Sequence, residues 1–395
     1  MVSVCFYFQV HQPYRLNPYS VFDVGKHSRY FNEGKNSSIL SRVARKCYLP
    51  TNTIMLDLLD RHPEFKISYS FSGVALQQFE EYVPEVIDSF KELVKTGKVE
   101  ILDETYSHSL AFFYSRNEFA EQVRLHRQKI RKLFKQTPNV FRNTELIYSN
   151  ELGKEVERLG YAGVLAEGAD YILGWRSPNF VYSPVNSKIS LLLKNYKLSD
   201  DIAFRFSNRE WKEWPLTAEK FASWVNAING NGNCVNLFMD YETFGEHQWP
   251  ETGIFNFMKK LPEEILKHPD NNFMTPSELI RAYKPLAEID MPNAVSWADI
   301  ERDMSAWTGN QMQRSALKQL YELEYAVKAN GSKKLLEDWR RLQSSDIFYY
   351  MCTKWFSDGD VHKYFNPHDS PYEAFIAFMN ILNDLKQRSA LKVIA

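Results

Sequence analysis

Acidic and histidine side chains crowd the stretch that follows residues 235–239. The apolar run Val235–Met239 is entered from a segment rich in Gly and Asn, so it predicts a short buried strand. Side chains at the carboxyl end of a strand lie on the face where α/β sheets and barrels bind ligands. One carboxylate there would as often cap a helix, but several beside aromatic rings favour a site that holds a sugar ring. The residues in question are Asp240, Tyr241, Glu242, Phe244, Glu246, His247 and Trp249.

Three more predicted strands end in residues of the same kind. Residues 2–8 lead to His11, residues 98–103 lead to His108, and residues 139–145 end at Glu145. A lone histidine at a strand end is more often structural, so the convergence of several strands matters more than any one residue. Two carboxylates from different strands are what hydrolysis of a glycosidic bond requires. One attacks the anomeric carbon or positions water, and the other protonates the departing oxygen, so the two must be held in different protonation states.

The elements that would position these residues alternate between strand and helix. From the first strand to residue 166 the pattern reads βαβαβα, which predicts a parallel sheet or barrel. After residue 175 the pattern becomes shorter and mixed. The helices expected between the strands cover residues 39–61, 84–96, 117–134, 149–159 and 216–228, and further strands are expected at 161–166, 189–193 and 202–206.

The residues after 298 follow another pattern. Three long, charged, amphipathic segments cover residues 299–330, 333–358 and 371–389, with no convincing strand among them. Such segments predict a helical domain. A chain of 395 residues is long enough for one barrel with an appendage or for two domains.

Composition limits the class of partner. The net charge is −1, which suggests neither a nucleic acid nor a membrane surface as partner. We find no run of about 18 or more apolar residues and no secretory signal at the first residues, so we expect a cytoplasmic protein. The four cysteines lack metal-ligand spacing and are expected to be reduced, mostly buried thiols.

Five ordered segments together resemble glycoside hydrolase family 57, and the short α-amylase-type members in particular. The resemblance implies a retaining enzyme that acts on α-1,4-glucans or malto-oligosaccharides. We separately expect no cofactor and no metal. The resemblance also implies an incomplete seven-stranded (β/α) barrel over residues 1–285, with a helical domain over residues 286–395 that packs over the active-site face. The segments are His11-Gln12-Pro13, Gly97–Glu100 with His108, Phe141–Glu145, Asp240–Gly245 and Ser296-Trp297.

The resemblance assigns roles residue by residue. Glu145 resembles the nucleophile and Asp240 the acid/base, while Glu242 would support Asp240. The predicted sugar contacts are His11, His108, Trp249, Trp297 and Trp307. The chain departs from many family members at Gln9 and at Phe141-Arg142-Asn143, which leaves both carboxylates in place and puts substrate preference in question.

Three alternatives remain open at this point. The same site could serve a 4-α-glucanotransferase or a branching enzyme, since transfer differs from hydrolysis only in the acceptor. A metal-dependent hydrolase would use His11, His108 and His247, although none of the usual paired-histidine spacings occurs. A non-catalytic glucan-binding protein would have no need to keep both Glu145 and Asp240. The sequence predicts neither the preferred glucan length nor the oligomeric state.

Overall fold

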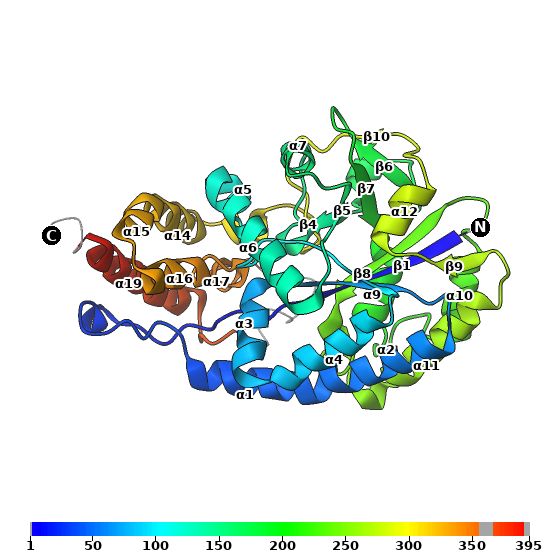
Figure 1. Ribbon diagram of the computed structural model, residues 1–395, viewed down its shortest axis with the longest axis horizontal. Coiled ribbons are helices and arrows are strands. Elements are labelled where there is room, and N and C mark those ends of the chain that lie inside the picture. The colour runs from blue at the N-terminus through cyan, green and yellow to red at the C-terminus, as the bar shows by residue number, and fades with distance from the viewer. Residues whose placement is uncertain (1, 355–365, 391–395) are drawn as a thin grey trace.

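The computed structural model describes residues 2–354 and 366–390, and its strands form two five-stranded sheets (Figure 1). In the described residues all strand pairs are parallel except β6 with β7. The first sheet has the order β3 (Val99–Ile101), β2 (Ile67–Phe71), β1 (Val2–Val10) and β8 (Cys234–Asp240), with β9 (Asn271–Phe273) also paired to β1. The second has the order β10 (Glu288–Ile289), β6 (Val181–Pro184), β7 (Ser190–Lys194), β5 (Gly163–Glu167) and β4 (Val140–Arg142).

The central strand β1 is buried along its whole length. Successive side chains of a strand point to opposite faces. One set, which includes Val4, Phe6 and Phe8, packs against the surrounding helices. The other set includes Cys5 and Tyr7, which join a small core with residues of the second sheet such as Leu192. The alternation therefore makes β1 the wall between the helical layer and the interior between the sheets.

The two sheets approach each other along both edges. Asp103, just after β3, forms a single parallel bridge with Phe141 of β4. On the other side, the backbone N–H of Asn195 donates to the carbonyl oxygen of Asn236 in β8 at 2.9 Å. The expected α/β class is confirmed. The strand pairing gives two sheets linked by isolated contacts, so it does not by itself confirm the expected seven-stranded barrel.

Helices cover the outer faces of both sheets. The first sheet is packed by α1 (Glu33–Val43), α2 (Leu49–Arg61), α3 (Gly73–Tyr82), α4 (Pro84–Lys95), α10 (Ala218–Asn226) and α11 (Ile254–Leu266). Residues of α5 (Ala111–Tyr114), α6 (Arg116–Phe134), α7 (Asn150–Arg158) and α8 (Asp170–Leu173) share a hydrophobic core with residues of the second sheet, and α12 (Pro276–Ala282) packs against that sheet through Leu279. A π-helical turn, Ala44–Tyr48, joins α1 to α2, so the helix expected at 39–61 has a bulge just before Pro50.

One expected strand is wrong. Residues 202–206 were predicted as a strand from a short apolar run, but α9 (Tyr196–Ala203) covers the beginning of that range. The Asn195 side chain caps α9 by accepting from the backbone N–H of Leu198. A cap of this kind stabilises the helical conformation of the residues that follow it.

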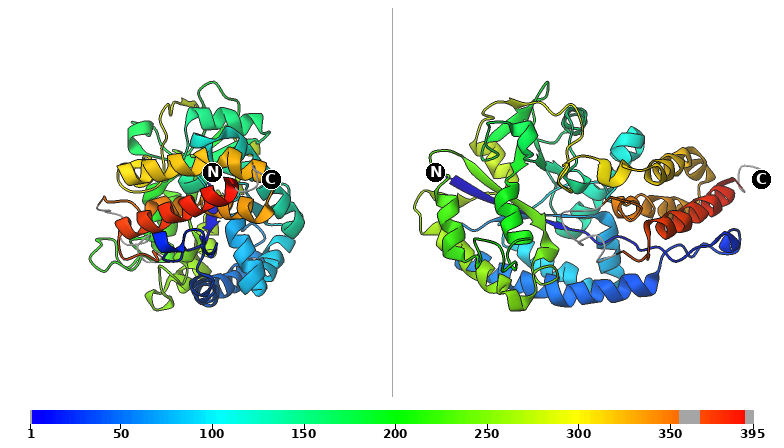
Figure 2. Two further views of the ribbon diagram at one scale, coloured as in Figure 1. Left: turned by 90° about the vertical axis from the view of Figure 1, so that its left-hand side faces the viewer. Right: turned by 180° about the vertical axis from the view of Figure 1, so that it is seen from behind.

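The C-terminal helices lie together at the end of the molecule opposite the N-terminus (Figures 1 and 2). The loop after β1 reaches them, because Asp384 accepts hydrogen bonds from Tyr30 and from the backbone N–H of Gly25. The group consists of α13 (Ser305–Thr308), α14 (Gln311–Glu322), α15 (Glu324–Asn330), α16 (Lys333–Arg341), α17 (Ser345–Tyr349) and α19 (Pro371–Ala390). Part of the helical segment expected at 333–358 lies outside the described residues.

The four cysteines are free and buried, as expected. Over residues 2–354 and 366–390, no helix has the length and apolar character needed to cross a membrane.

Candidate active site

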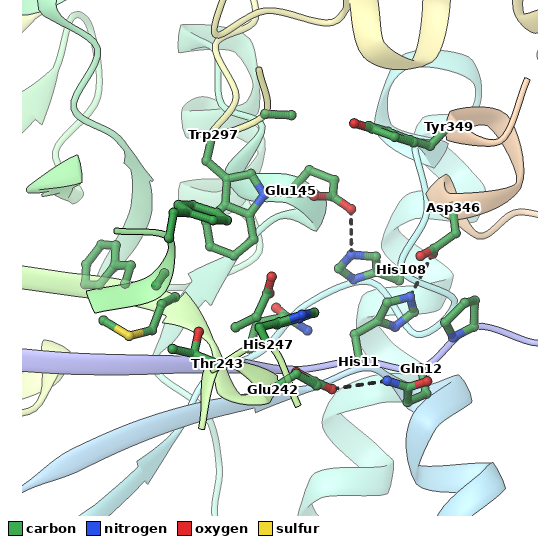
Figure 3. Close-up of a pocket in the computed structure, with 18 of the residues that line it drawn as sticks. His11, Gln12, His108, Glu145, Glu242, Thr243, His247, Trp297, Asp346 and Tyr349 are labelled. Atoms are coloured by element: carbon green, nitrogen blue, oxygen red, sulfur yellow. Dashed lines mark hydrogen bonds and ion pairs between the residues drawn. The ribbon is translucent and has the colours of Figure 1, made fainter. Parts of the chain in front are cut away.

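A cavity lies at the carboxyl ends of the strands of both sheets (Figure 3). Its volume is about 1170 Å³, part of which is open solvent. Glu145, from the segment after β4, and Asp240, the last residue of β8, both line it, together with His11 and His108. Four side chains that the sequence put at strand ends therefore share one cavity.

Glu145 sits in a 3₁₀ turn, Thr144–Leu146, that directly follows β4. Its backbone is left-handed, with φ 56° and ψ 27°. A residue other than Gly adopts this conformation at a cost of about 1–3 kcal/mol, so the surrounding structure must hold it there. The backbone N–H of Trp297 does so by donating to the carbonyl oxygen of Glu145 at 3.2 Å.

The Glu145 carboxylate accepts hydrogen bonds from three separate segments. Trp297 Nε1 donates to Oε2 at 2.8 Å, while His108 Nε2 and Ser345 Oγ lie 3.3 Å from Oε1. Donors of this kind stabilise the ionised form of a carboxyl group and fix its direction. The side chain is only 8% exposed, so little water competes with these donors.

His108 bridges two carboxylates. Its Nδ1 lies 2.8 Å from Glu104 Oε2, and its Nε2 faces Glu145. Burial alone would lower the pKa of His108, but hydrogen bonds and the negative charges of Glu104 and Glu145 raise it to about 9. At neutral pH the ring is therefore an imidazolium that donates to both acids. Burial raises the pKa of Glu104, but the hydrogen bond and positive charge of His108 outweigh burial and lower this pKa to about 2. The same contact therefore raises the pKa of His108 and lowers that of Glu104.

This raised pKa predicts a pH-dependent stability. Since the folded pKa of about 9 lies above the ordinary histidine pKa of 6.5, the charged ring stabilises the fold fully below pH 6.5. The contribution, on the order of 3 kcal/mol, is lost as the pH rises through about 9. We expect the free energy of unfolding of the wild type to fall between pH 6 and pH 10 by more than that of His108→Gln. Parallel curves from chemical denaturation of the two proteins would contradict the assignment.

His11 stacks on His108, with ring centroids 3.9 Å apart and planes inclined by 20°. Burial and the positive charge of His108 lower the pKa of His11. As a neutral ring it can accept from Ser72 Oγ at Nδ1, at 2.7 Å, and donate from Nε2 to Asp346 Oδ2, at 2.8 Å. One histidine is therefore held neutral and its neighbour charged.

Glu242 lies in the 3₁₀ turn after β8 and is buried near Asp240. Tyr48 and Gln12 donate hydrogen bonds to its Oε1, the second at 3.3 Å. Burial, followed by the charge of Asp240, raises the pKa of Glu242 to about 8. Near pH 7 most of the Glu242 carboxyl is therefore neutral.

Trp297 lines the cavity, and two cations fix its ring. The Arg142 guanidinium carbon is 4.9 Å and Lys194 Nζ is 5.3 Å from the ring centroid. Lys194 also pairs with Asp200 at 3.0 Å. The indole is thus oriented both by its hydrogen bond to Glu145 and by cation–π contacts.

Two other predicted aromatic residues lie elsewhere. Trp307 is fully buried and packs edge-on against Tyr349, which itself lines the cavity. Trp249 is 54% exposed, has Lys46 Nζ 5.2 Å from its ring centroid, and is not among the residues that line the cavity. The structure therefore does not bring either ring to the cavity wall, because Trp307 packs in the core and Trp249 lies on the surface.

Sequence reasoning missed several lining residues. Asp346 and Tyr349 come from α17, in a segment where apolar spacing indicates only a helix. Lys194 ends β7, and its position after an apolar run is a signal in the sequence that identifies a strand end. His247, from the loop after β8, also lines the cavity.

In the described parts of the chain, no three His, Cys, Asp or Glu side chains form a group that could hold a metal ion. The metal-dependent alternative therefore has no candidate ligand set among these residues.

Comparisons with known proteins point to one family. The family model described as "Glycosyl hydrolase family 57" matches residues 5–292. A Methanocaldococcus jannaschii protein named "Putative alpha-amylase" is 43% identical over 400 residues, which cover 97% of this chain and 84% of that protein. The chain spans about two fifths of the length of the alpha-amylases of Pyrococcus species that it matches at 22–24% identity.

Two solved structures share the fold. The alpha-amylase AmyC of Thermotoga maritima aligns with a TM-score of 0.65 at 14% identity, over 99% of this chain and 94% of that one. A family 57 branching enzyme of Thermococcus kodakaraensis aligns with a TM-score of 0.67 at 14% identity, over 88% and 85% of the two chains.

Proposed function

The chain belongs to glycosyl hydrolase family 57, and from this premise we propose that it is a retaining hydrolase of α-1,4-glucans, of the α-amylase type. Glu145 is the nucleophile and Asp240 is the acid/base. The observation that carries the proposal is that both carboxylates line one cavity, where three donors hold the carboxylate of Glu145.

In the first step of this mechanism, Glu145 attacks the anomeric carbon of a bound glucosyl unit. The glycosidic bond breaks as Asp240 transfers a proton to the departing oxygen, and a β-glucosyl ester of Glu145 results. In the second step, Asp240 takes a proton from water, and the hydroxide oxygen displaces Glu145 from the anomeric carbon. The product keeps the α configuration and both carboxyl groups return to their starting states.

The surrounding charges suit these roles. The His108 imidazolium and the Trp297 indole favour an anionic Glu145 before attack. Asp240 and Glu242 form a neighbouring pair of acids, and the raised pKa of Glu242 indicates that this pair retains a proton near pH 7. Exchange of that proton within the pair would keep Asp240 supplied as an acid.

The sugar contacts follow from the lining residues. We assign His11, His108 and Trp297 to the subsites next to the scissile bond, and Glu242 to the support of Asp240. We assign Trp249 to the binding of glucosyl units farther from the scissile bond, since its ring is exposed. Trp307 acts indirectly, through its packing against Tyr349.

We extend the proposal to the architecture. The two sheets would act as one incomplete (β/α) barrel. The bridge between Asp103 and Phe141 and the hydrogen bond between Asn195 and Asn236 would join the sheets at their edges. Residues 1–285 would form the catalytic part and residues 286–395 the helical part. The 288–289 strand that pairs with β6 then ties the second part to the first.

The Trp297 hydrogen bond can be tested separately from the ring. Trp297→Phe removes the Nε1 donor to Glu145 and keeps an aromatic wall. A charge-assisted hydrogen bond contributes about 1.5–3 kcal/mol, so we expect kcat on maltoheptaose to fall about 10- to 100-fold with a smaller change in KM. The control is Trp249→Phe, which should change kcat less than threefold. A rise in KM with unchanged kcat would assign Trp297 to sugar binding alone.

Hydrolysis is distinguished from transfer by its products. If water is the acceptor, maltoheptaose yields shorter sugars only. Longer α-1,4 products would mean a 4-α-glucanotransferase, and new α-1,6 linkages would mean a branching enzyme. Chromatography and linkage analysis after incubation with the purified protein therefore test the proposed acceptor.

A further inference from the structure

A second cavity lies between α3, α6, α16 and the loop after β3, outside the site described above. Its volume is about 1000 Å³, part of it open solvent. We propose that it is an effector site for a small phosphorylated sugar. The proposal is carried by the charge of its walls, by buried polar atoms of its lining residues that lack a hydrogen bond to the described residues, and by the elements that join it to the candidate active site.

The walls carry an excess of positive charge. Five cationic residues face one acid, Glu337. Lys129 pairs with Glu80, Arg340 with Glu118 and Glu121, and Arg341 with Glu337. The ammonium groups of the remaining two, Lys132 and Lys333, have no ion pair or hydrogen bond to any residue within 2–354 and 366–390. Lys333 is also the first residue of α16, where the helix dipole favours an anion.

Three residues that line the cavity carry a buried polar atom that has no hydrogen-bond partner among the described residues. Ser107 is 0% exposed, and its Oγ makes no hydrogen bond to the described residues. Gln77 and Arg341 are half-buried residues, but Gln77 Oε1 and Arg341 Nε are buried and also lack a hydrogen bond to the described residues. A buried polar atom without a partner costs about 1–3 kcal/mol, which a bound ligand recovers.

These atoms select the ligand class. Lys132, Lys333 and Arg341 supply donors for a phosphate group, while Gln77 supplies an acceptor and Ser107 a hydroxyl for sugar hydroxyls. The ring of Tyr106 adds an aromatic surface of the kind that packs against a sugar. Neither a neutral sugar nor inorganic phosphate alone would use both sets of groups.

Three wall elements continue directly into the candidate active site. Tyr106 and Ser107 immediately precede His108, which faces Glu145. Helix α3 begins after Ser72, which holds His11. Helix α16 leads to α17, where the backbone N–H of Ser345 donates to the His108 carbonyl oxygen at 2.9 Å. A ligand that orders these walls would shift both histidines, although its effect on turnover rests on the proposed function.

The binding test uses isothermal titration calorimetry of the full chain with glucose 6-phosphate, inorganic phosphate, glucose and ATP. We expect saturable binding of one glucose 6-phosphate, tighter than phosphate or glucose. Lys132→Ala/Lys333→Ala should weaken it at least tenfold, because each charge-assisted hydrogen bond contributes a factor of about ten. Both lysines are exposed, so the fold should persist. The matched control, Lys154→Ala/Lys259→Ala, removes two exposed lysines elsewhere and should leave affinity within twofold.

Several results would overturn the proposal. These are no saturable binding at millimolar concentrations, tighter binding of ATP, an equal loss in the control, or displacement of glucose 6-phosphate by maltoheptaose. In a second arm, glucose 6-phosphate should change kcat on maltoheptaose in the wild type and not in the Lys132/Lys333 variant. Binding without that change would refute the effector role. An absence of turnover in every protein would refute the proposed function, while the calorimetry would still decide the site.

Discussion

Glu145→Gln is expected to lower kcat on maltoheptaose on the order of 10⁴-fold or more, because a carboxamide cannot form the glucosyl ester. The substitution keeps the size of the side chain, and KM should change little if Glu145 acts mainly in the transition state. Steady-state kinetics measure both constants. The first products of the wild type, followed by NMR, should carry the α configuration, since a covalent intermediate requires two inversions.

Two controls separate this expectation from loss of the fold. Glu263→Gln changes an exposed residue of α11 and should leave kcat within twofold of the wild type. Because Trp297, His108 and Ser345 all donate to Glu145, the free energy of unfolding of Glu145→Gln should be measured as well. A folded variant that retains a tenth of the wild-type kcat, or initial products of the β configuration, would remove Glu145 from the nucleophile role.

The convergence on one cavity was predictable because it depends on a local rule. In parallel α/β structure, residues after strand carboxyl ends meet at one edge, and His11, His108, Glu145 and Asp240 each follow an apolar run. The left-handed backbone of Glu145 was not predictable, since it depends on a hydrogen bond from Trp297, far along the chain.

The helical part of the site could not be predicted from local patterns. Asp346 orients His11 across 335 positions of sequence, and nothing near residue 346 distinguishes this acid from a solvated one. Trp307 shows the opposite case. It was predicted as a sugar contact because it follows the Ser296-Trp297 segment, but its side chain is fully buried in the core. Tyr349 belongs to both the core and the site, since it packs against Trp307 and also lines the cavity.

The sheets show the same division. The alternation in β1 defines two faces, and in the structure Phe6 and Phe8 pack with the helices while Tyr7 joins the core between the sheets. Sheet closure depends on long-range contacts such as the one between Asp103 and Phe141. A periodic pattern within one strand contains no information about such a contact, so the sequence could predict α/β class but not two linked sheets.

Asp240→Asn is expected to have an effect that depends on the leaving group. For maltoheptaose, whose leaving sugar needs a proton, kcat/KM should fall about 10²- to 10⁴-fold. For an aryl malto-oligoside with an acidic phenol, the first step needs no proton, and phenol release in a rapid initial burst should be nearly preserved. Turnover after the burst should remain slow, because Asp240 is also the base that activates water.

The variant also tests the coupling between Asp240 and Glu242. The negative charge of Asp240 is the second cause, after burial, of the raised pKa of Glu242, so Asp240→Asn should lower that pKa from about 8. An NMR titration of ¹³C-labelled glutamate carboxyls can follow the shift, with Asp88→Asn as a control, since Asp88 is exposed on α4. An equal loss in the rate of the first step for both leaving groups would contradict the acid role, and an unchanged pKa of Glu242 would contradict a shared proton. The leaving-group dependence and the pKa of Glu242 are independent tests, because Asp240 can act as the acid even if it shares no proton with Glu242.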